Sequence, residues 1–403
     1  MTNVFCRTLP LAPPYNGAVR SCFAIVVSLA AGAAFASPAP EPPADAVVGV
    51  LPFEESAEPN RVMVDLAPEG GRPFVMLLDT GASDSVLTPR MARQLGVRVR
   101  RLKTDPYRRA TRLGRDVQFW IDTTSSDTAS RTGWEYGLLG AEFLNDFVLE
   151  IDFPGRVVRF LDPKKYEVPE QVGAEDERVV AVGMTSSRPI VPIRVNGEEL
   201  KVVLDTGGPG TGVLSGAAVR ALGLDVETLP AFGRIGLVVG ETDARLLEVP
   251  EFALAGFPLG LVALRVAPKG IFNMGAGNDS LIGYDVLAPF VIRIDYPRRR
   301  LWLKRKSDAP IGFYGGPYAL ARQTGAFVRA TPNGWSVWAL APGSAAEKLG
   351  VRVGDVIVSA SREGAPPPDE VLRGILDGKE VQVSRRQGEL WVDTVLPEAE
   401  AAD

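Results

Sequence analysis

Short apolar runs, broken by glycine, proline, asparagine or charged residues, fill most of the chain. Runs of this kind, rich in β-branched residues, are typical of β-strands. Residues 192–204 predict a hairpin with Asn196-Gly197 at its turn, because this dipeptide adopts the backbone of a two-residue loop. Helix-like spacing occurs in short segments such as 91–97 and 217–224. We therefore predict a mainly β protein.

The chain contains an internal repeat. Residues 74–82 (FVMLLDTGA) and 200–208 (LKVVLDTGG) each combine an apolar strand with the sequence Asp-Thr-Gly. A second pair of segments, 140–161 and 283–304, aligns without a gap, and each begins with a glycine that follows two apolar residues. Because both pairs occur in the same order, the chain holds two related units, which we call the first and the second repeat.

Changes in composition set the predicted boundaries. A charged linker separates the repeats, and a connector rich in glycine, proline and tyrosine follows the second. A Pro-rich stretch ahead of the first repeat is typical of an extended tether. The predicted organisation is a signal peptide at 1–36, a tether at 37–46, the first repeat at 47–166, a linker at 167–178, the second repeat at 179–306, a linker at 307–324, a third domain at 325–397 and a disordered tail at 398–403.

The N-terminal segment predicts export. An apolar run from residue 22 to residue 36 follows Arg7 and Arg20 and ends in the small residues of a signal-peptidase site. The run is short for a transmembrane helix, so a cleaved signal peptide is favoured over the alternative, an uncleaved membrane anchor. No later apolar span approaches the ~18 residues of a transmembrane helix. We expect no membrane span after cleavage and a periplasmic or secreted protein.

The residue counts exclude several kinds of chemistry. The 403 residues include no histidine, which excludes Ser-His-Asp and Cys-His catalysis and His-ligated metals. The two cysteines, Cys6 and Cys22, precede the predicted cleavage point, so we expect no thiol or disulfide in the exported chain. We expect no metal and no cofactor. The net charge of −5, without a basic stripe, gives no indication of nucleic-acid binding.

The two copies of Asp-Thr-Gly indicate a paired-carboxylate site. The carboxyl groups of Asp79 and Asp205, if held about 3 Å apart, share a proton because both cannot ionise easily. One then acts as a base toward water while its protonated partner polarises a peptide carbonyl. Asp-Thr-Gly is also a common turn sequence, but duplication alone does not explain why both acids are kept. The residues predicted to support the pair, the threonines by bracing the loops and the glycines by admitting the backbone, are Thr80, Gly81, Thr206 and Gly207.

These motifs resemble the retropepsin-like aspartic proteases. In that family each lobe supplies one Asp-Thr-Gly loop, and a strand ending apolar-apolar-Gly, here 138–140 and 281–283, passes beside it. The resemblance covers both repeats and implies two tandem lobes that form a bilobal cleft. It also implies that Asp79 and Asp205 are catalytic and that the substrate is a peptide or protein. As in pepsin, the dyad forms within one chain, so the resemblance implies a monomer.

The second motif departs from the family pattern. It reads Asp-Thr-Gly-Gly-Pro-Gly-Thr-Gly, and the interval from Asp205 to the next Val-Leu pair is one residue longer than the interval from Asp79. We expect this glycine-rich insertion to loosen the second carboxylate. The alternative function is therefore a catalytically weak or inactive peptide-binding protein, and an alternative assembly pairs each lobe with its counterpart in another chain. Asp152 and Asp295 also recur, and they read as strand-end turns.

The third domain resembles a PDZ domain of the kind associated with bacterial proteases, on the basis of residues 341–351 and 353–357. Such a domain adds a peptide as a strand, with the backbone of one loop receiving its carboxylate. The alternative is a structural cap on the second repeat. The sequence thus predicts an exported bacterial aspartic endopeptidase whose PDZ-like α+β domain recruits or regulates substrate. The candidate carboxylate-binding loop consists of Gly325, Ala326, Phe327 and Val328.

Overall fold

The computed structural model describes residues 39–54, 60–66, 74–87, 91, 107–110, 116–121, 137–208, 210–237, 240–267, 280–309, 311–312, 318–331, 334–358, 374–375, 377, 381–387 and 390–396. The chain divides into two compact units, 1–35 and 36–403, and these residues all belong to the second. The predicted signal peptide and tail lie outside the described residues, as do residues 92–97 of the first helix-like segment. Strands predominate over helices in the described part, which confirms the prediction of a mainly β protein. No described helix is long and apolar enough to cross a bilayer.

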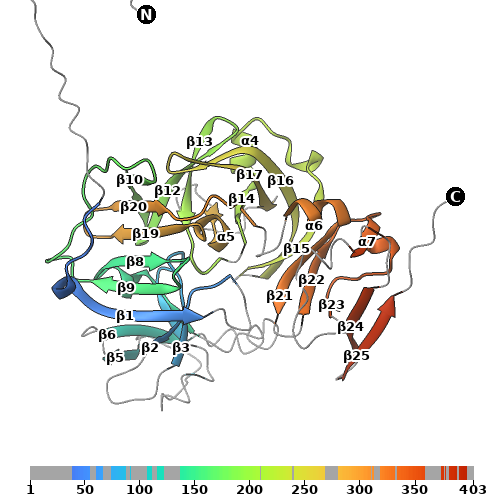
Figure 1. The fold of residues 1–403 in the computed structure, drawn as a ribbon, viewed down its shortest axis with the longest axis horizontal. Helices are drawn as coiled ribbons and strands as arrows, with labels where there is room; N and C mark the ends of the chain where they lie inside the picture. Colours follow the sequence, from blue (N-terminus) through green and yellow to red (C-terminus); the bar gives the residue numbers. More distant parts are fainter. Residues whose placement is uncertain are drawn as a thin grey trace, which may run out of the picture. The chain divides into compact units, whose positions relative to one another are not determined.

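The first repeat contributes strands that bury one face and leave polar residues outward, as in β2, where only Asp65 is exposed. Figure 1 shows these strands in blue and green. The elements of this part are η1 (Ala44–Ala46), β1 (Val47–Glu54), β2 (Met63–Leu66), β3 (Phe74–Leu78), β4 (Ser85–Leu87), β5 (Tyr107–Ala110), β6 (Asp116–Ile121), β7 (Gly137–Leu139), α3 (Ala141–Leu144), β8 (Val148–Asp152) and β9 (Val157–Leu161).

The second repeat follows a similar order with longer strands. The hairpin with its turn at Asn196-Gly197 is confirmed: both residues have positive φ, 49° and 92°, and β12 pairs with β13. The helix after β14 begins at Ser215, whose hydroxyl accepts the Ala218 N–H. The elements are β10 (Glu177–Ala181), β11 (Gly183–Thr185), β12 (Arg188–Val195), β13 (Glu198–Leu204), β14 (Gly212–Ser215), α4 (Gly216–Ala221), η2 (Val226–Thr228), β15 (Ala231–Leu237), β16 (Gly240–Leu254), β17 (Phe257–Ala267), β18 (Leu281–Ile282), α5 (Tyr284–Leu287), β19 (Phe290–Asp295) and β20 (Arg300–Arg305).

The sequence repeat is also a repeat of strand pairing. In the first repeat β3 runs parallel to β7, β7 runs antiparallel to β4, and β4 runs parallel to β6. In the second repeat β13, β18, β14 and β17 pair in the same order and with the same directions. Each Asp-Thr-Gly sequence therefore follows a strand, β3 or β13. That strand pairs with the apolar-apolar-Gly strand of its own repeat, β7 or β18.

One set of strands joins the repeats. In the largest sheet formed by the described strands, the order β10-β20-β19-β8-β9-β1 places three strands of the second repeat beside three of the first, and Figure 1 shows them side by side. The join is the antiparallel pair β8–β19. The same apolar core contains residues of both repeats, among them Phe147 and Phe160 of the first and Phe290 of the second. The hydrogen-bonded seam and the shared core fix the repeats against each other.

Two predicted boundaries need correction. The segment predicted as an extended tether is held by the fold: the Ala39 N–H donates to Glu177 Oε2 at 2.7 Å, and residues 44–46 form η1. The linker predicted at 167–178 ends earlier, because Glu177 and Arg178 already pair with β20. Proline content suggested the tether and charge suggested the linker, but neither shows that a buried carboxylate such as Glu177 binds the preceding segment.

The third domain forms a sheet with the strand order β21-β22-β23-β24-β25. The loop predicted at Gly325, Ala326, Phe327 and Val328 is wrong for the last three residues, which are buried in β21 and pair with β22. Phe327 packs edge-on against Phe232 of β15, with ring centroids 5.0 Å apart, so this side of the strand contacts the second repeat. The elements are α6 (Tyr318–Thr324), β21 (Ala326–Thr331), β22 (Gly334–Leu340), α7 (Ala345–Lys348), β23 (Val356–Ile357), β24 (Val381–Gln387) and β25 (Leu390–Leu396).

Candidate active site

The two Asp-Thr-Gly loops begin in equivalent ways. The Asp79 N–H donates to the Leu139 carbonyl at 3.0 Å, and the Asp205 N–H donates to the Ile282 carbonyl at the same distance. The apolar-apolar-Gly strands β7 and β18 thus hold the start of each loop. The glycines that end these strands are required by close approach: a Cβ on Gly283 would lie 2.6 Å from the Gly210 carbonyl oxygen.

The two threonines lock the loops to each other. The Thr80 hydroxyl donates to the Leu204 carbonyl at 2.6 Å and accepts the Thr206 N–H at 3.1 Å. The Thr206 hydroxyl does the reverse, donating to the Leu78 carbonyl at 2.7 Å and accepting the Thr80 N–H at 3.1 Å. Both threonines are fully buried. Four reciprocal hydrogen bonds therefore fix the two loops in register.

The glycines admit the two carboxyl groups. Gly81 and Gly207 each donate their N–H to the aspartate of their own loop, at 2.8 and 3.0 Å. A Cβ on Gly81 would lie 2.5 Å from Asp205 Cγ, and a Cβ on Gly207 would collide with Asp79 Cγ. Each carboxyl group thus lies against the glycine of the opposite loop, and the structure brings Asp79 and Asp205 together.

The carboxyl groups perturb each other. Burial, the negative charge of Asp205 and the hydrogen bond between the two side chains hold the pKa of Asp79 well above its usual range. Burial also raises the pKa of Asp205, but the hydrogen bond from Asp79, the N–H groups of Gly208 and Gly207 and the charge of Arg61 all oppose that rise. The pKa of both carboxyl groups is therefore raised, and the pair holds a proton more tightly than two separate aspartates would.

The glycine-rich sequence of the second loop does not loosen Asp205. Gly208 donates a further N–H to Asp205 Oδ1 at 2.9 Å, beside the bond from Gly207. The Gly208 carbonyl in turn accepts the Tyr284 N–H at 3.0 Å. The glycine-rich sequence therefore anchors the second carboxylate, contrary to expectation, because backbone without side chains can approach it closely.

No sequence pattern marks Arg61 as a site residue. It precedes β2, its side chain is buried, and its Nη1 donates to the Gly207 carbonyl at 3.2 Å. A single arginine before a strand carries no pattern in a sequence, so only the fold shows that it lies beside the second loop. Tyr296 is also buried near the pair, and burial and the charge of Asp79 raise the pKa of its phenol.

Asp152 and Asp295 have the structural role predicted from the sequence. Asp152 Oδ1 accepts the Gly155 N–H at 2.8 Å, and Asp295 accepts the N–H groups of Arg298 and Val168, both at 3.1 Å. Both aspartates end strands and stabilise the turns that follow. Within the described ranges, no group of three or more histidine, cysteine, aspartate or glutamate side chains is placed to hold a metal ion.

Comparison with known proteins agrees with this geometry. A model of the aspartyl protease family matches residues 62–113 and 191–286, which include both Asp-Thr-Gly loops. A solved structure of a retropepsin-like aspartic protease from Rickettsia conorii matches with 22% identity and a TM-score of 0.26, over 32% of this chain and 90% of that one. A search of curated proteins gives no match. The family match, which covers both loops, supports an aspartic protease.

Proposed function

We propose that the protein is an exported aspartic endopeptidase in which Asp79 and Asp205 hydrolyse peptide bonds. The observation that carries the proposal is the reciprocal lock between Thr80 and Thr206, which has no use in a pair of independent turns. It holds two half-buried carboxyl groups together at fixed geometry, and such a pair retains one proton.

The single proton defines the roles of the two acids. Asp205, as the carboxylate, takes a proton from a water molecule that attacks the peptide carbonyl carbon. Asp79 gives its proton to the carbonyl oxygen, so a neutral tetrahedral diol forms and the charge on the pair is unchanged. Asp205 then transfers the proton to the amide nitrogen while Asp79 recovers its own from a diol hydroxyl. The C–N bond breaks, giving a carboxylic acid and an amine.

Two tandem lobes with a cleft between them are part of this proposal. Support comes from the matched strand pairing of the repeats and from the β8–β19 seam, which joins them. Both aspartates belong to the same described unit of the chain. We infer a monomer with the pair formed within one chain, in the periplasm or outside the cell.

The third domain supports a role in substrate recruitment. Its strand β21 lies at the edge of the sheet, which is the position where a PDZ-like domain would add a peptide as a further strand. Helix α6 of this domain also contacts the second repeat. The Tyr318 hydroxyl donates to Glu248 Oε1 at 2.7 Å, and Arg322 forms an ion pair with the same carboxylate. We propose a PDZ-like module that is fixed to the protease part rather than tethered.

Cleavage of an unfolded protein tests the function. The exported form is incubated with a denatured protein from pH 3 to pH 8, alongside Asp79→Asn, Asp205→Asn and the control Asp65→Asn, which alters an exposed aspartate of β2. We expect each site variant to lose about 10²–10⁴-fold in rate, because an acid or base partner is removed, and the control to retain the rate. A protein that binds peptides but cleaves none would establish the alternative, a non-catalytic peptide-binding protein.

A further inference from the structure

A local two-fold axis passes through one pair of side chains at the seam between the repeats. In the β8–β19 ladder, Leu149 pairs with Ile294, Glu150 with Arg293, and Ile151 with Ile292. The gap-free alignment of 140–161 with 283–304 makes Glu150 the counterpart of Arg293. The two equivalent positions thus face each other at the centre of the seam, and we call Glu150 and Arg293 the axial pair.

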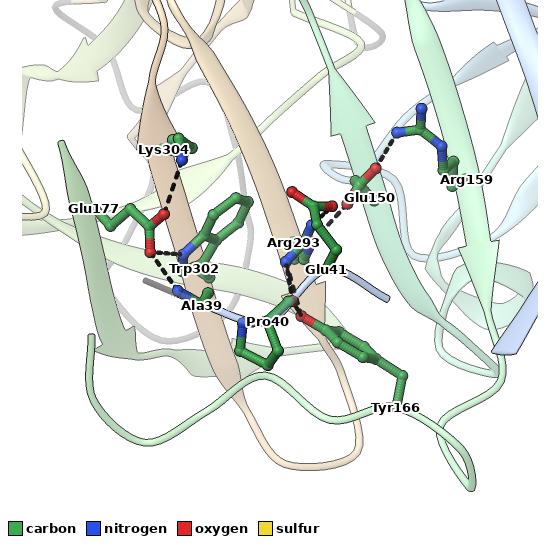
Figure 2. A network of polar contacts seen from close by, with 10 residues as sticks. All are labelled: Ala39, Pro40, Glu41, Glu150, Arg159, Tyr166, Glu177, Arg293, Trp302 and Lys304. Carbon is green, nitrogen blue, oxygen red and sulfur yellow. Dashed lines mark hydrogen bonds and ion pairs between the residues drawn. The ribbon is translucent and has the colours of Figure 1, made fainter. Parts of the chain in front are cut away.

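The axial pair is buried and bonded on all sides. Both side chains are 2% exposed, and Arg293 Nε donates to Glu150 Oε2 at 2.5 Å. Figure 2 shows the guanidinium group lying between Glu150 and Glu41, with Nη2 bonded to Glu41 Oε2 at 3.1 Å. Nη1 donates to the Pro40 carbonyl at 3.1 Å and to the Tyr166 hydroxyl at 2.9 Å.

The neighbours of the axial pair differ between the repeats. The lateral row across the sheet reads Arg159, Glu150, Arg293, Trp302. Arg159 forms a second ion pair with Glu150, and the Arg293 guanidinium carbon lies 4.2 Å from the centre of the Trp302 ring. The two equivalent positions therefore differ in charge and in surroundings. Glu150 is an acid beside the basic Arg159, and Arg293 is a base beside the aromatic Trp302.

We propose that the axial pair specifies which repeats assemble: a first repeat accepts a second repeat and rejects another first repeat. If two first repeats joined through β8 in this register, the two copies of Glu150 would meet at the buried axis. If two second repeats joined through β19, two copies of Arg293 would meet, with only tryptophan beside them. Like charges in an interface weaken the wrong assembly by several kcal/mol, on the order of 10²–10³-fold.

This specificity matters because the two loops are not interchangeable. Arg61 of the first repeat bonds to the Gly207 carbonyl of the second, and the second loop is one residue longer than the first. An assembly of like repeats would place two copies of Asp79, or of Asp205, at the site. The consequence for the site rests on the proposed function, whereas the assembly rule itself does not.

Charge exchange between two chains tests the rule. In Arg293→Glu the axis of one chain holds two acids, and in Glu150→Arg it holds two bases. When the variants are mixed, the unsubstituted Glu150 of one chain can meet the unsubstituted Arg293 of the other, and the introduced charges meet each other. We expect each variant alone to unfold at a lower temperature than the wild type. The mixture should form a 1:1 complex by native mass spectrometry, at least tenfold above the control mixture, and regain thermal stability.

The control and a second variant make every outcome decisive. The control mixture is Arg245→Glu with Glu227→Arg, which reverses an ion pair between the half-buried Arg245 and the exposed Glu227 inside the second repeat. If a single variant is unstable alone, the two chains are co-expressed, and each should rescue the other. The doubly reversed chain Glu150→Arg/Arg293→Glu should be a stable monomer. The rule is overturned if the mixture forms no more complex than the control, or if neither co-expression nor double reversal restores folding. Both readouts are independent of proteolysis.

Discussion

Asp79 and Asp205 lie so close that each one occupies the space a side chain on the opposite glycine would need. Gly81→Ala is therefore expected to displace Asp205 while leaving the β-sheets intact. A displacement of about 1 Å at reacting groups lowers rates on the order of 10²-fold, and kcat/KM on a peptide measures it. The matched control is Gly183→Ala, whose Cβ would make an ordinary contact 3.5 Å from Ile190. Equal activity in both variants would contradict the geometry of the site.

The threonine lock makes a second residue-level prediction. Thr80→Val leaves the Leu204 carbonyl without its donor and the Thr206 N–H without its acceptor. Buried groups that lose their partners cost about 1–3 kcal/mol, so urea unfolding should show a loss of stability of that size. Thr80→Ser keeps the hydroxyl and should recover most of the loss. A serine variant as unstable as the valine variant would show that the methyl group matters more than the hydrogen bonds.

Arg61 predicts an effect on pH dependence. Its positive charge lowers the pKa of Asp205, so Arg61→Gln should raise that pKa. The active form needs Asp205 ionised and Asp79 protonated, and the acid limb of the rate profile should move to higher pH. The pH dependence of kcat/KM for the wild type and for Arg61→Gln measures this shift. An unchanged acid limb, with only a lower maximum, would reduce Arg61 to a structural contact.

The sequence predicted that Asp79 and Asp205 belong together but not what surrounds them. The repeated Asp-Thr-Gly with matched flanks carries that prediction, and the two side chains do lie against the opposite loops. The same pattern suggested a loosened second loop, and the structure shows the reverse, since Gly208 adds a hydrogen bond. Arg61 could not be predicted from the sequence, because a lone arginine reaches the site only through contacts between distant segments.

At the level of elements, the segment ahead of β1 acts as part of the fold. Glu177 is buried and takes hydrogen bonds from Ala39, Trp302 and Lys304, which together lower its pKa despite the opposing effect of burial. Figure 2 shows the same short segment closing over Arg293. A Pro-rich composition predicts that a segment is extended. It does not predict that buried charged side chains, here Glu177 and Arg293, bind that segment.

Truncation tests the role of this segment. A chain beginning after Glu41 loses the bonds from Arg293 to Pro40 and Glu41 and the bond from Ala39 to Glu177. At about 1 kcal/mol for each lost hydrogen bond, thermal unfolding should shift to lower temperature. A chain beginning at Ala39 is the control and should match the full exported chain. Identical unfolding of the two truncated chains would show that the segment contributes nothing.

Strand pairing was predictable only locally. The Asn196-Gly197 hairpin follows from turn residues between apolar runs, and it is confirmed. The β8–β19 seam pairs strands that are far apart in the chain, and no local pattern specifies that pairing. The candidate PDZ loop was misplaced because a Gly-Ala-Phe-Val sequence suits the first residues of a strand as well as a loop.

For the whole molecule, the carboxyl pair links stability to pH. The pKa of Asp79 is raised in the folded state, so the folded chain holds a proton that the unfolded chain releases. Stability is then full below the unfolded pKa, near 3.8, and falls as pH rises toward the folded pKa. Asp79→Asn removes this dependence and should unfold at a higher temperature than the wild type at pH 8, with little difference at pH 3.5. If the unfolding temperatures of the wild type and Asp79→Asn differed by the same amount at pH 3.5 and pH 8, the shared proton would be contradicted.

We propose that one chain carries a complete site, with Asp79 and Asp205 as its two acids. The most direct test is the cleavage rate of an equimolar mixture of Asp79→Asn and Asp205→Asn chains, compared with the wild type and with each variant alone. We expect cleavage by the wild type only, because neither chain of the mixture contains both acids. Cleavage by either variant alone would remove that aspartate from the chemistry, and cleavage by the mixture alone would show that the site forms between chains.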